Sequence, residues 1–223
     1  MGGATALDHD VLLLAGGTAA RETFPNLPDV ADLDGLARRA NGRWLLSFDV
    51  PVTLGGQLYR PADVVEYNPM LTSYALAFDS DTAAIPDGVD TDAVAVAPDG
   101  TLVLSFDSNF GTGPLFYRSG DLVNATATQL GSVRFDALAA GLAADMNVDS
   151  AAYDGGGQLV LSFDSSGSVG TTVWQDQDLV ARVGGSWRIY ARLAALDDSW
   201  DAADLDALDI TGIGDGVFCN GYE

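Results

Sequence analysis

The 223-residue chain contains one cysteine, Cys219, one histidine, His9, and no lysine. A lone cysteine can form neither a disulfide within the chain nor a thiolate cluster for zinc. A nucleophilic triad needs an imidazole held by structured neighbours, and His9 lies near the start of the chain, so we interpret it as a surface residue. Cys219 has no histidine near it in sequence, and we interpret it as a packing residue of the last strand.

Basic residues and long apolar runs are also scarce. The 32 acidic residues outnumber the 10 arginines, which gives a formal net charge of −22. This charge repels phosphate backbones and anionic lipids, so we expect no nucleic acid partner and no membrane insertion. No run approaches the roughly 20 apolar residues of a membrane span. The charge suits a multivalent cation, a basic partner or simply a solvated acidic coat.

Helical patterns and nucleotide-binding motifs are missing as well. No P-loop, dinucleotide-binding glycine pattern or HExxH sequence is present. The stretches Phe135 to Asp145 and Ala191 to Ala203 contain helix formers, but each lies in a connection and predicts at most a short turn. The first residues, MGGATALD, have no signal-peptide pattern. An all-β, acidic, lysine-free repeat is nevertheless what we expect in an extracellular or periplasmic protein.

What is present is a repeated β-hairpin, clearest in Val89 to Asp107. Alternating valine and alanine from Ala93 to Ala97 lead into the turn Pro98-Asp99-Gly100, and a second alternating strand ends at Phe106. Four copies start at aspartates separated by 58, 57 and 57 residues: Asp34, Asp92, Asp149 and Asp206. The first three copies have a phenylalanine 14 residues later: Phe48, Phe106 and Phe163.

A second kind of hairpin alternates with the first and begins with an aspartate followed by branched apolar residues. Its copies start at Asp10, Asp63, Asp121 and Asp178. An aromatic-polar pair precedes the last three: Tyr59-Arg60, Tyr117-Arg118 and Trp174-Gln175. These aromatic residues form either a ligand-facing stripe or packing contacts between repeats, and we favour packing. Eight hairpins predict sixteen strands.

About 57 residues with four short strands is the size of a propeller blade. We therefore predict a single all-β domain over residues 1–223, a four-bladed β-propeller. The repeat units are approximately 32–89, 90–146 and 147–203, with half-units at 1–31 and 204–223. If each blade is a first-type hairpin followed by a second-type hairpin, the terminal half-units must pair and close the ring, which removes exposed sheet edges. The opposite phase needs no such pairing, and a solenoid or a pair of sandwiches remains an alternative.

Two resemblances follow from these repeats. The aspartate-small pairs that open the units (Asp34-Gly35, Asp92-Ala93, Asp149-Ser150 and Asp206-Ala207), with a glycine turn and an aromatic-ended strand, resemble the repeat of hemopexin-type four-bladed propellers. Those domains are usually clasped by a disulfide, which one cysteine cannot provide. The stretch Ala77 to Ser108 is more closely similar to a repeat of uncharacterised secreted bacterial β-propeller-like proteins. This second resemblance implies an extracellular module and identifies no catalytic residue.

The end of the chain, GDGVFCNGYE, also resembles a short C-terminal ending of secreted proteins from some gammaproteobacteria. We prefer to interpret its Val217 and Phe218 as the last strand of the repeat.

Each unit begins with an acid or amide, a spacer and an aspartate, and these residues predict a calcium site. The pairs are Asp32 and Asp34, Asp90 and Asp92, Asn147 and Asp149, and Asp204 and Asp206. In a strand, residues two apart face the same way, and calcium favours six to eight oxygen ligands. The alternative is that these aspartates cap turns through backbone N–H groups. The loops after Asp107 and Asp164 are weaker calcium candidates.

The sequence predicts no catalytic residue. A carbohydrate-active enzyme with a carboxylate pair is an alternative, but the acids outside the repeat pattern share no context: Glu66, Asp176, Asp197 and Asp198. Another alternative is an extracellular surface or matrix protein that self-assembles through its terminal half-repeats. We predict a secreted, acidic binding or scaffold module with a central calcium ion. Its expected partner is a protein or a glycan.

Overall fold

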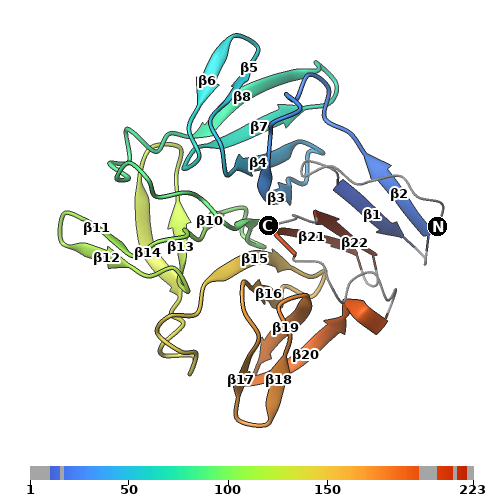
Figure 1. Cartoon of the computed structure of the whole chain (residues 1–223), viewed down its shortest axis with the longest axis vertical. Helices are drawn as coiled ribbons and strands as arrows, with labels where there is room; N and C mark the ends of the chain where they lie inside the picture. The colour runs from blue at the N-terminus through green and yellow to red at the C-terminus, as the bar shows by residue number, and fades with distance from the viewer. Residues whose placement is uncertain (1–10, 16–17, 196–204, 213–214, 220–223) are drawn as a thin grey trace.

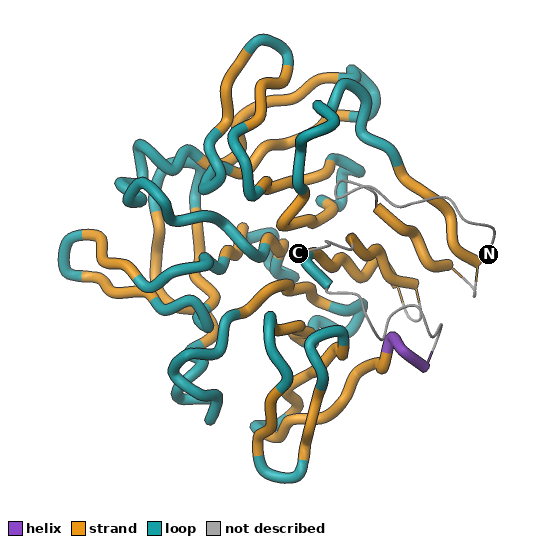
Figure 2. The backbone as a smooth tube through the Cα atoms, in the orientation of Figure 1, coloured by secondary structure: helices purple, strands orange, loops and turns teal. Residues whose placement is uncertain are grey.

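The computed structural model describes residues 11–15, 18–195, 205–212 and 215–219, which form an all-β structure (Figure 1, Figure 2). The helical part of this description is one short 3₁₀ turn, Leu193–Ala195. Residues 136 to 145 form turns and irregular structure, as their place in a connection predicted.

Sixteen of the strands form four antiparallel sheets of four strands, each described here from its inner to its outer strand. The first sheet contains β3 (Leu33–Arg38), β4 (Trp44–Phe48), β7 (Val64–Asn68) and β8 (Ser73–Phe78). The second contains β9 (Val94–Val96), β10 (Leu102–Leu104), β13 (Leu122–Ala125) and β14 (Leu130–Phe135). The third contains β15 (Val148–Tyr153), β16 (Leu159–Phe163), β19 (Asp178–Val183) and β20 (Ser186–Arg192).

The terminal sheet joins the two ends of the described chain. Its order is β21 (Ala207–Gly212), β22 (Asp215–Cys219), β1 (Val11–Ala15) and β2 (Thr18–Glu22). Strands β1 and β22 pair antiparallel, with Val11 opposite Cys219 and Leu14 opposite Gly216. The predicted pairing of the N-terminal and C-terminal hairpins is therefore present. The phase is first-type then second-type in every sheet, which excludes the opposite phase.

The four sheets lie around a common centre, where β3, β15 and β21 are innermost (Figure 1). Strand β9 has the same place in the second sheet, since it contacts both β3 and β15. Each inner strand contacts the next one in cyclic order: β3 with β9, β9 with β15, β15 with β21, and β21 with β3. This arrangement is propeller-like and is incompatible with an open line of repeats.

Three two-stranded ribbons were missed by the sequence analysis, which predicted sixteen strands, whereas the described residues form 22. They are β5 (Val52–Leu54) with β6 (Gln57–Tyr59), β11 (Phe110–Thr112) with β12 (Leu115–Tyr117), and β17 (Gly167–Val169) with β18 (Thr172–Trp174). Each ribbon lies between the second and third strands of its sheet along the chain. Three-residue strands are too short for alternation to predict them.

The aromatic residues that end these ribbons are buried. Tyr59 and Tyr117 are 1% exposed and Trp174 is 0% exposed. The Tyr117 hydroxyl donates to the carbonyl of Gly131, 3.0 Å away, and thereby ties the ribbon to β14. The packing interpretation is therefore correct, and the ligand-facing stripe is wrong.

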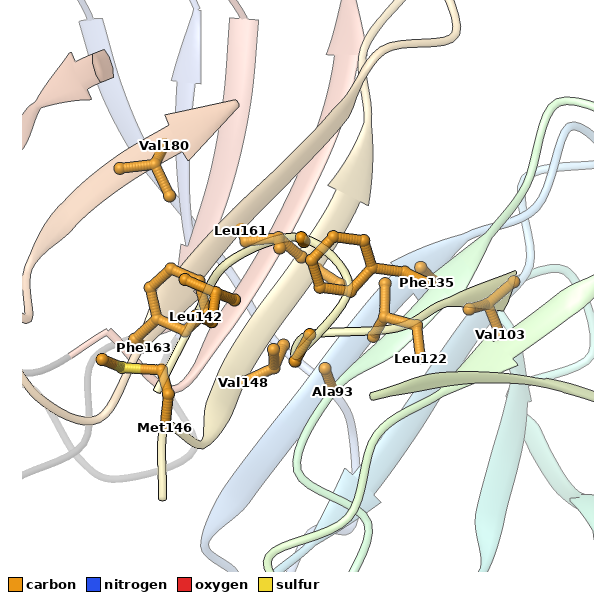
Figure 3. Packing of buried hydrophobic residues seen from close by; sticks show 14 of the residues in the cluster. Ala93, Val103, Leu122, Phe135, Leu142, Met146, Val148, Leu161, Phe163 and Val180 are labelled. Carbon is orange, nitrogen blue, oxygen red and sulfur yellow. The ribbon is translucent and has the colours of Figure 1, made fainter. Parts of the chain in front are cut away.

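The core consists of apolar layers between neighbouring sheets (Figure 3). Between the second and third sheets, Val103, Leu122 and Phe135 pack with Val148, Leu161 and Phe163. The residues beside Val103 in β10, Leu102 and Leu104, instead join the layer toward the first sheet. Successive side chains of a strand point to opposite faces, and here both faces are covered, so β10 is apolar and buried at all three positions.

Candidate functional site

The leading aspartates all lie at or just before the start of an inner strand. Asp34 and Asp149 are the second residues of β3 and β15, Asp206 directly precedes β21, and Asp92 lies two residues before β9. Because the inner strands surround one centre, their starts bring these four side chains to the same end of it.

The charges that act on Asp34 indicate that the four side chains lie close together. Burial raises the pKa of Asp34 well above its usual range, and the charges of Asp92, Asp149 and Asp206 raise it further. Asp34 is densely surrounded by protein, yet part of it stays accessible to solvent. The structure thus unites residues that are 57 or 58 positions apart in the chain.

A second set of aspartates surrounds the quartet and comes from the Ser-Phe-Asp ends of the second strands. Burial raises the pKa of Asp92 well above its usual range, a hydrogen bond from Asn147 opposes this rise, and the charges of Asp107, Asp164 and Asp90 add to it. Burial, then Asp107 and Asp49, raise the pKa of Asp90 to about 6. We name as the central cluster Asp34, Asp49, Asp90, Asp92, Asp107, Asp149, Asp164 and Asp206, together with Asn147.

Sequence reasoning placed Asp107 and Asp164 in separate loop sites and missed Asp49. The signal was available, since all three end the repeated Ser-Phe-Asp sequence. Of the other predicted residues, Asp32 accepts a backbone hydrogen bond from Asp49 through its carbonyl, at 3.2 Å. Asp204 lies outside the described residues.

Hydrogen bonds hold parts of the central cluster in place. The Asn147 amide donates to Asp92 Oδ2 at 2.6 Å, a contact between the third and second repeat units. The backbone N–H of Asp90 donates to Asp107 Oδ1 at 2.8 Å, and the N–H of Asp107 donates to the carbonyl of Asp90 at 3.1 Å. Asp107 thus binds the backbone N–H of Asp90 across the repeat unit, whereas Asp92 is held by a neighbouring repeat.

The arginine ion pairs lie away from this cluster. Arg39 and Arg43 bind Glu66, and Arg134 binds Asp99. Arg60, Arg118 and Arg192 bind acids of the ribbon ends and outer loops. None of these six arginines pairs with a central aspartate, so the cluster concentrates negative charge that these pairs do not neutralise.

The central carboxylates are close enough to interact, but they are not preassembled as ligands. Within the part of the chain that the structure describes, no group of three or more His, Cys, Asp or Glu side chains is arranged to hold a metal ion. A bound cation would therefore have to draw the carboxylates closer together. The prediction of calcium at Asp34, Asp92, Asp149 and Asp206 stays a prediction.

Buried serines next to the cluster connect neighbouring sheets. The Ser105 hydroxyl accepts a hydrogen bond from the N–H of Ala93 and donates to the carbonyl of Val148, each at 2.9 Å. Ser162 donates in the same way to the carbonyl of Leu205, at 3.3 Å. Val148 and Leu205 directly precede Asp149 and Asp206. The serine of the Ser-Phe-Asp sequence thus helps to place the next leading aspartate.

Three aspartates of the second-type hairpins, Asp63, Asp121 and Asp178, are structural, and the fourth, Asp10, lies outside the described residues. Asp63 is 6% exposed and accepts hydrogen bonds from the N–H of Arg60 and from both the N–H and the hydroxyl of Ser80. Asp121 and Asp178 are similarly buried and accept N–H groups three residues before them. These carboxylates connect the ribbon end to the loop beyond the outer strand and are not available for a ligand.

Of the acids considered for catalysis, Glu66 and Asp176 lie among the described residues, Glu66 on a strand of the first sheet and Asp176 in the turn that precedes β19 of the third sheet. Glu66, on β7, forms ion pairs with two arginines, and Asp176 accepts a local backbone hydrogen bond from Gln177. Asp197, Asp198 and His9 lie outside the described residues.

Sequence comparisons identify no family for the chain: no protein-family model matches it, and no curated protein matches it. Among solved structures, YCF48 bound to D1 peptide is 10% identical with a TM-score of 0.47, and the match covers 94% of this chain and 62% of that one. A catalytically inactive virginiamycin B lyase from Staphylococcus aureus with quinupristin is 7% identical with a TM-score of 0.46, covering 96% and 74%.

A third match is the extracellular domain of the one-component system BT4673 from B. thetaiotaomicron, at 10% identity and a TM-score of 0.37, covering 83% of this chain and 30% of that one. The chain thus spans less than two thirds of YCF48 and less than a third of BT4673. Among the described residues, no helix is long and apolar enough to cross a membrane.

Proposed function

We propose that the chain is a four-bladed β-propeller that serves as a binding or scaffold module, with calcium bound in its central cluster. Each four-stranded sheet is one blade of about 57 residues, and the two terminal hairpins together form the fourth. In this proposal residues 1–223 make one domain, and the propeller presents its loops and ribbons to a protein or glycan partner.

The observation that carries the proposal is the convergence of Asp34, Asp92, Asp149 and Asp206 from four separate sheets. The mutual repulsion of these carboxylates is unfavourable, and a divalent cation would offset it. Calcium accepts variable numbers of oxygen ligands at variable geometry, which suits carboxylates that must move to bind it. Asp34, Asp92, Asp149 and Asp206 would hold the ion, with Asp90 and Asn147 beside them.

A calcium titration of the whole chain, followed by thermal unfolding, tests the proposal. If the folded state binds calcium, a concentration 100 times Kd stabilises it by about 2.7 kcal/mol, equivalent to a rise in Tm of roughly 5–10 °C. Calorimetry of the same titration gives the number of sites. Asp34→Asn should reduce the calcium-dependent rise in Tm.

The matched control is Asp87→Asn, because the Asp87 side chain is 98% exposed and pairs with Arg60, which is not part of the cluster. This variant should keep the full response. A wild-type Tm that does not change in millimolar calcium would remove calcium from the proposal.

We also propose an extracellular or periplasmic location. Calcium sites of extracellular modules have Kd values of about 10⁻⁴ to 10⁻³ M, a range in which a cluster that must rearrange could operate. Fractionation of the producing cells tests this location, and recovery of the protein only from the cytosol would contradict it.

A further inference from the structure

The terminal sheet differs from the other three in how it is connected. In the first, second and third sheets all four strands follow one another along the chain. In the terminal sheet the ladder between β1 and β22 joins segments from opposite ends of the described chain. This ladder involves four residue pairs, from Val11 with Cys219 to Leu14 with Gly216.

No covalent bond can secure this ladder within one chain. Cys219 is the only cysteine, so the hairpin of β1 and β2 cannot be tied to β22 by a disulfide. The hairpin is instead held by its backbone pairing and by packing, in which Val11 is fully buried beside Leu33 and Ala207. Every one of these contacts can also be made by the same hairpin of another copy.

The connection from β2 to β3, residues 23–32, is the point at which the β1–β2 hairpin could separate from the rest of its own chain, which we call the body. Phe24 packs edge-on against Trp44 and Tyr67, with ring centroids 5.7 and 5.5 Å apart, and the Tyr74 hydroxyl donates to the carbonyl of Pro25 at 2.8 Å. The body therefore holds the connection from Phe24 onward, and the hairpin extends from this anchor.

The backbone conformation of residues 23–32 also bears on how the hairpin could separate. Asn26 has a φ of 66°, in the left-handed region, and Pro25 and Pro28 flank the turns. Proline fixes φ and limits the ways in which a short connection can fold back compactly. An extended connection would release this left-handed turn, which makes residues 23–32 the hinge for an exchange of hairpins between copies.

We propose that the edge of β22 accepts the β1–β2 hairpin of a second copy of this chain, which gives a hairpin-exchanged dimer. The partner is identified by the ladder itself, since the exchanged and unexchanged forms make the same β1–β22 pairs. Reciprocal exchange closes the dimer and leaves no unpaired β22 edge. The choice between the two forms depends on chain concentration during folding, because exchange competes with an intramolecular association.

A mixed disulfide experiment tests the exchange. One chain carries Val11→Cys and Cys219→Ser, and the other is the wild type, whose only cysteine is Cys219. Directly opposite residues of antiparallel strands have Cα atoms about 4.5–5.5 Å apart, within the range of a disulfide. Refolding of the two chains together under oxidising conditions should link them, and the ratio of linked dimer to monomer should rise about tenfold for each tenfold rise in concentration.

The matched control carries Ala20→Cys and Cys219→Ser. Ala20 belongs to the same hairpin, but its strand pairs with β1 and not with β22. This control should give far less linked dimer. Equal linkage from both variants would overturn the proposal, because random collisions would then explain it.

Light scattering of the wild type keeps the proposal testable if a variant fails to fold. Wild-type protein refolded at about 1 mM should contain a dimer that is absent after refolding at about 1 µM. A monomer at both concentrations would overturn the proposal. Calcium takes no part in these measurements, so their outcome is independent of the proposed function.

Discussion

At the scale of single residues, the same serine of the repeat has different partners in different sheets. Ser105 bonds to two backbone groups, whereas the fully buried Ser47 hydroxyl has no hydrogen-bond partner among the described residues. The difference lies in the residue opposite. Gly35 lacks the Cβ that Ala93 has, and the Ser47 hydroxyl occupies the space where that Cβ would be.

The first prediction concerns Ser105→Ala. Loss of the Ser105 hydroxyl removes a hydrogen bond from the buried N–H of Ala93 and another to the carbonyl of Val148. We therefore expect the free energy of unfolding to fall by about 1–3 kcal/mol. Chemical denaturation measures this change. Ser47→Ala is the matched control, and it should be nearly neutral or stabilising because it removes a hydroxyl that is already unsatisfied. Equal losses in both variants would contradict this account of the serines.

At the scale of elements, the residue opposite the buried aromatic ring differs in size from ribbon to ribbon. Val52 faces Tyr59, Phe110 faces Tyr117, and Gly167 faces Trp174. A Cβ at position 167 would lie 2.5 Å from Trp174 Cζ2 and 2.8 Å from Met146 Cε. The larger indole ring therefore requires the smallest residue opposite it.

The second prediction is that Gly167→Ala destabilises the protein by about 1–3 kcal/mol, because overpacking forces the buried indole to shift. Thermal unfolding and Trp174 fluorescence report the loss and the displacement. Gly155→Ala is the control, since a Cβ there would meet no atom within 4 Å. A neutral Gly167→Ala would mean that Trp174 moves without cost.

At the scale of the whole molecule, acidic groups in low-dielectric surroundings oppose folding at neutral pH. Burial raises the pKa of Asp209 to about 6, although the backbone N–H and the charge of Arg38 oppose this rise. Asp209 lies on β21 and joins the terminal sheet to the first sheet through this contact with Arg38. Burial raises the pKa of Asp90 as well, also to about 6.

The third prediction follows from these raised values. An unfolded aspartate loses its proton near pH 3.9, whereas these two keep theirs to about pH 6, so the folded state binds more protons between the two values. Stability should therefore fall as pH rises from about 4 to about 6, and Tm should be several degrees higher at pH 5 than at pH 7.5 in the absence of calcium.

Asp209→Asn should flatten this pH dependence, and Asp87→Asn, at an exposed position, should leave it unchanged. Circular dichroism during thermal unfolding measures both. A Tm that rises from pH 5 to pH 7.5 would show that other carboxylates with lowered pKa values outweigh Asp90 and Asp209.

The sequence by itself determined the repeats and the sixteen strands of their eight hairpins, because alternation and spacing are local or periodic properties that recur in each copy. It also determined which aspartates open each unit. The sequence left the pairing of the terminal hairpins open, because the opposite phase needs no such pairing. Only the tertiary structure decided that Asp49, Asp107 and Asp164 join that quartet. It also decided that Asp63 accepts hydrogen bonds from Ser80 and that Trp174 is buried. Those outcomes depend on which side chains meet across sheets. A contact between strands that are distant in sequence leaves no periodic pattern from which it could be predicted.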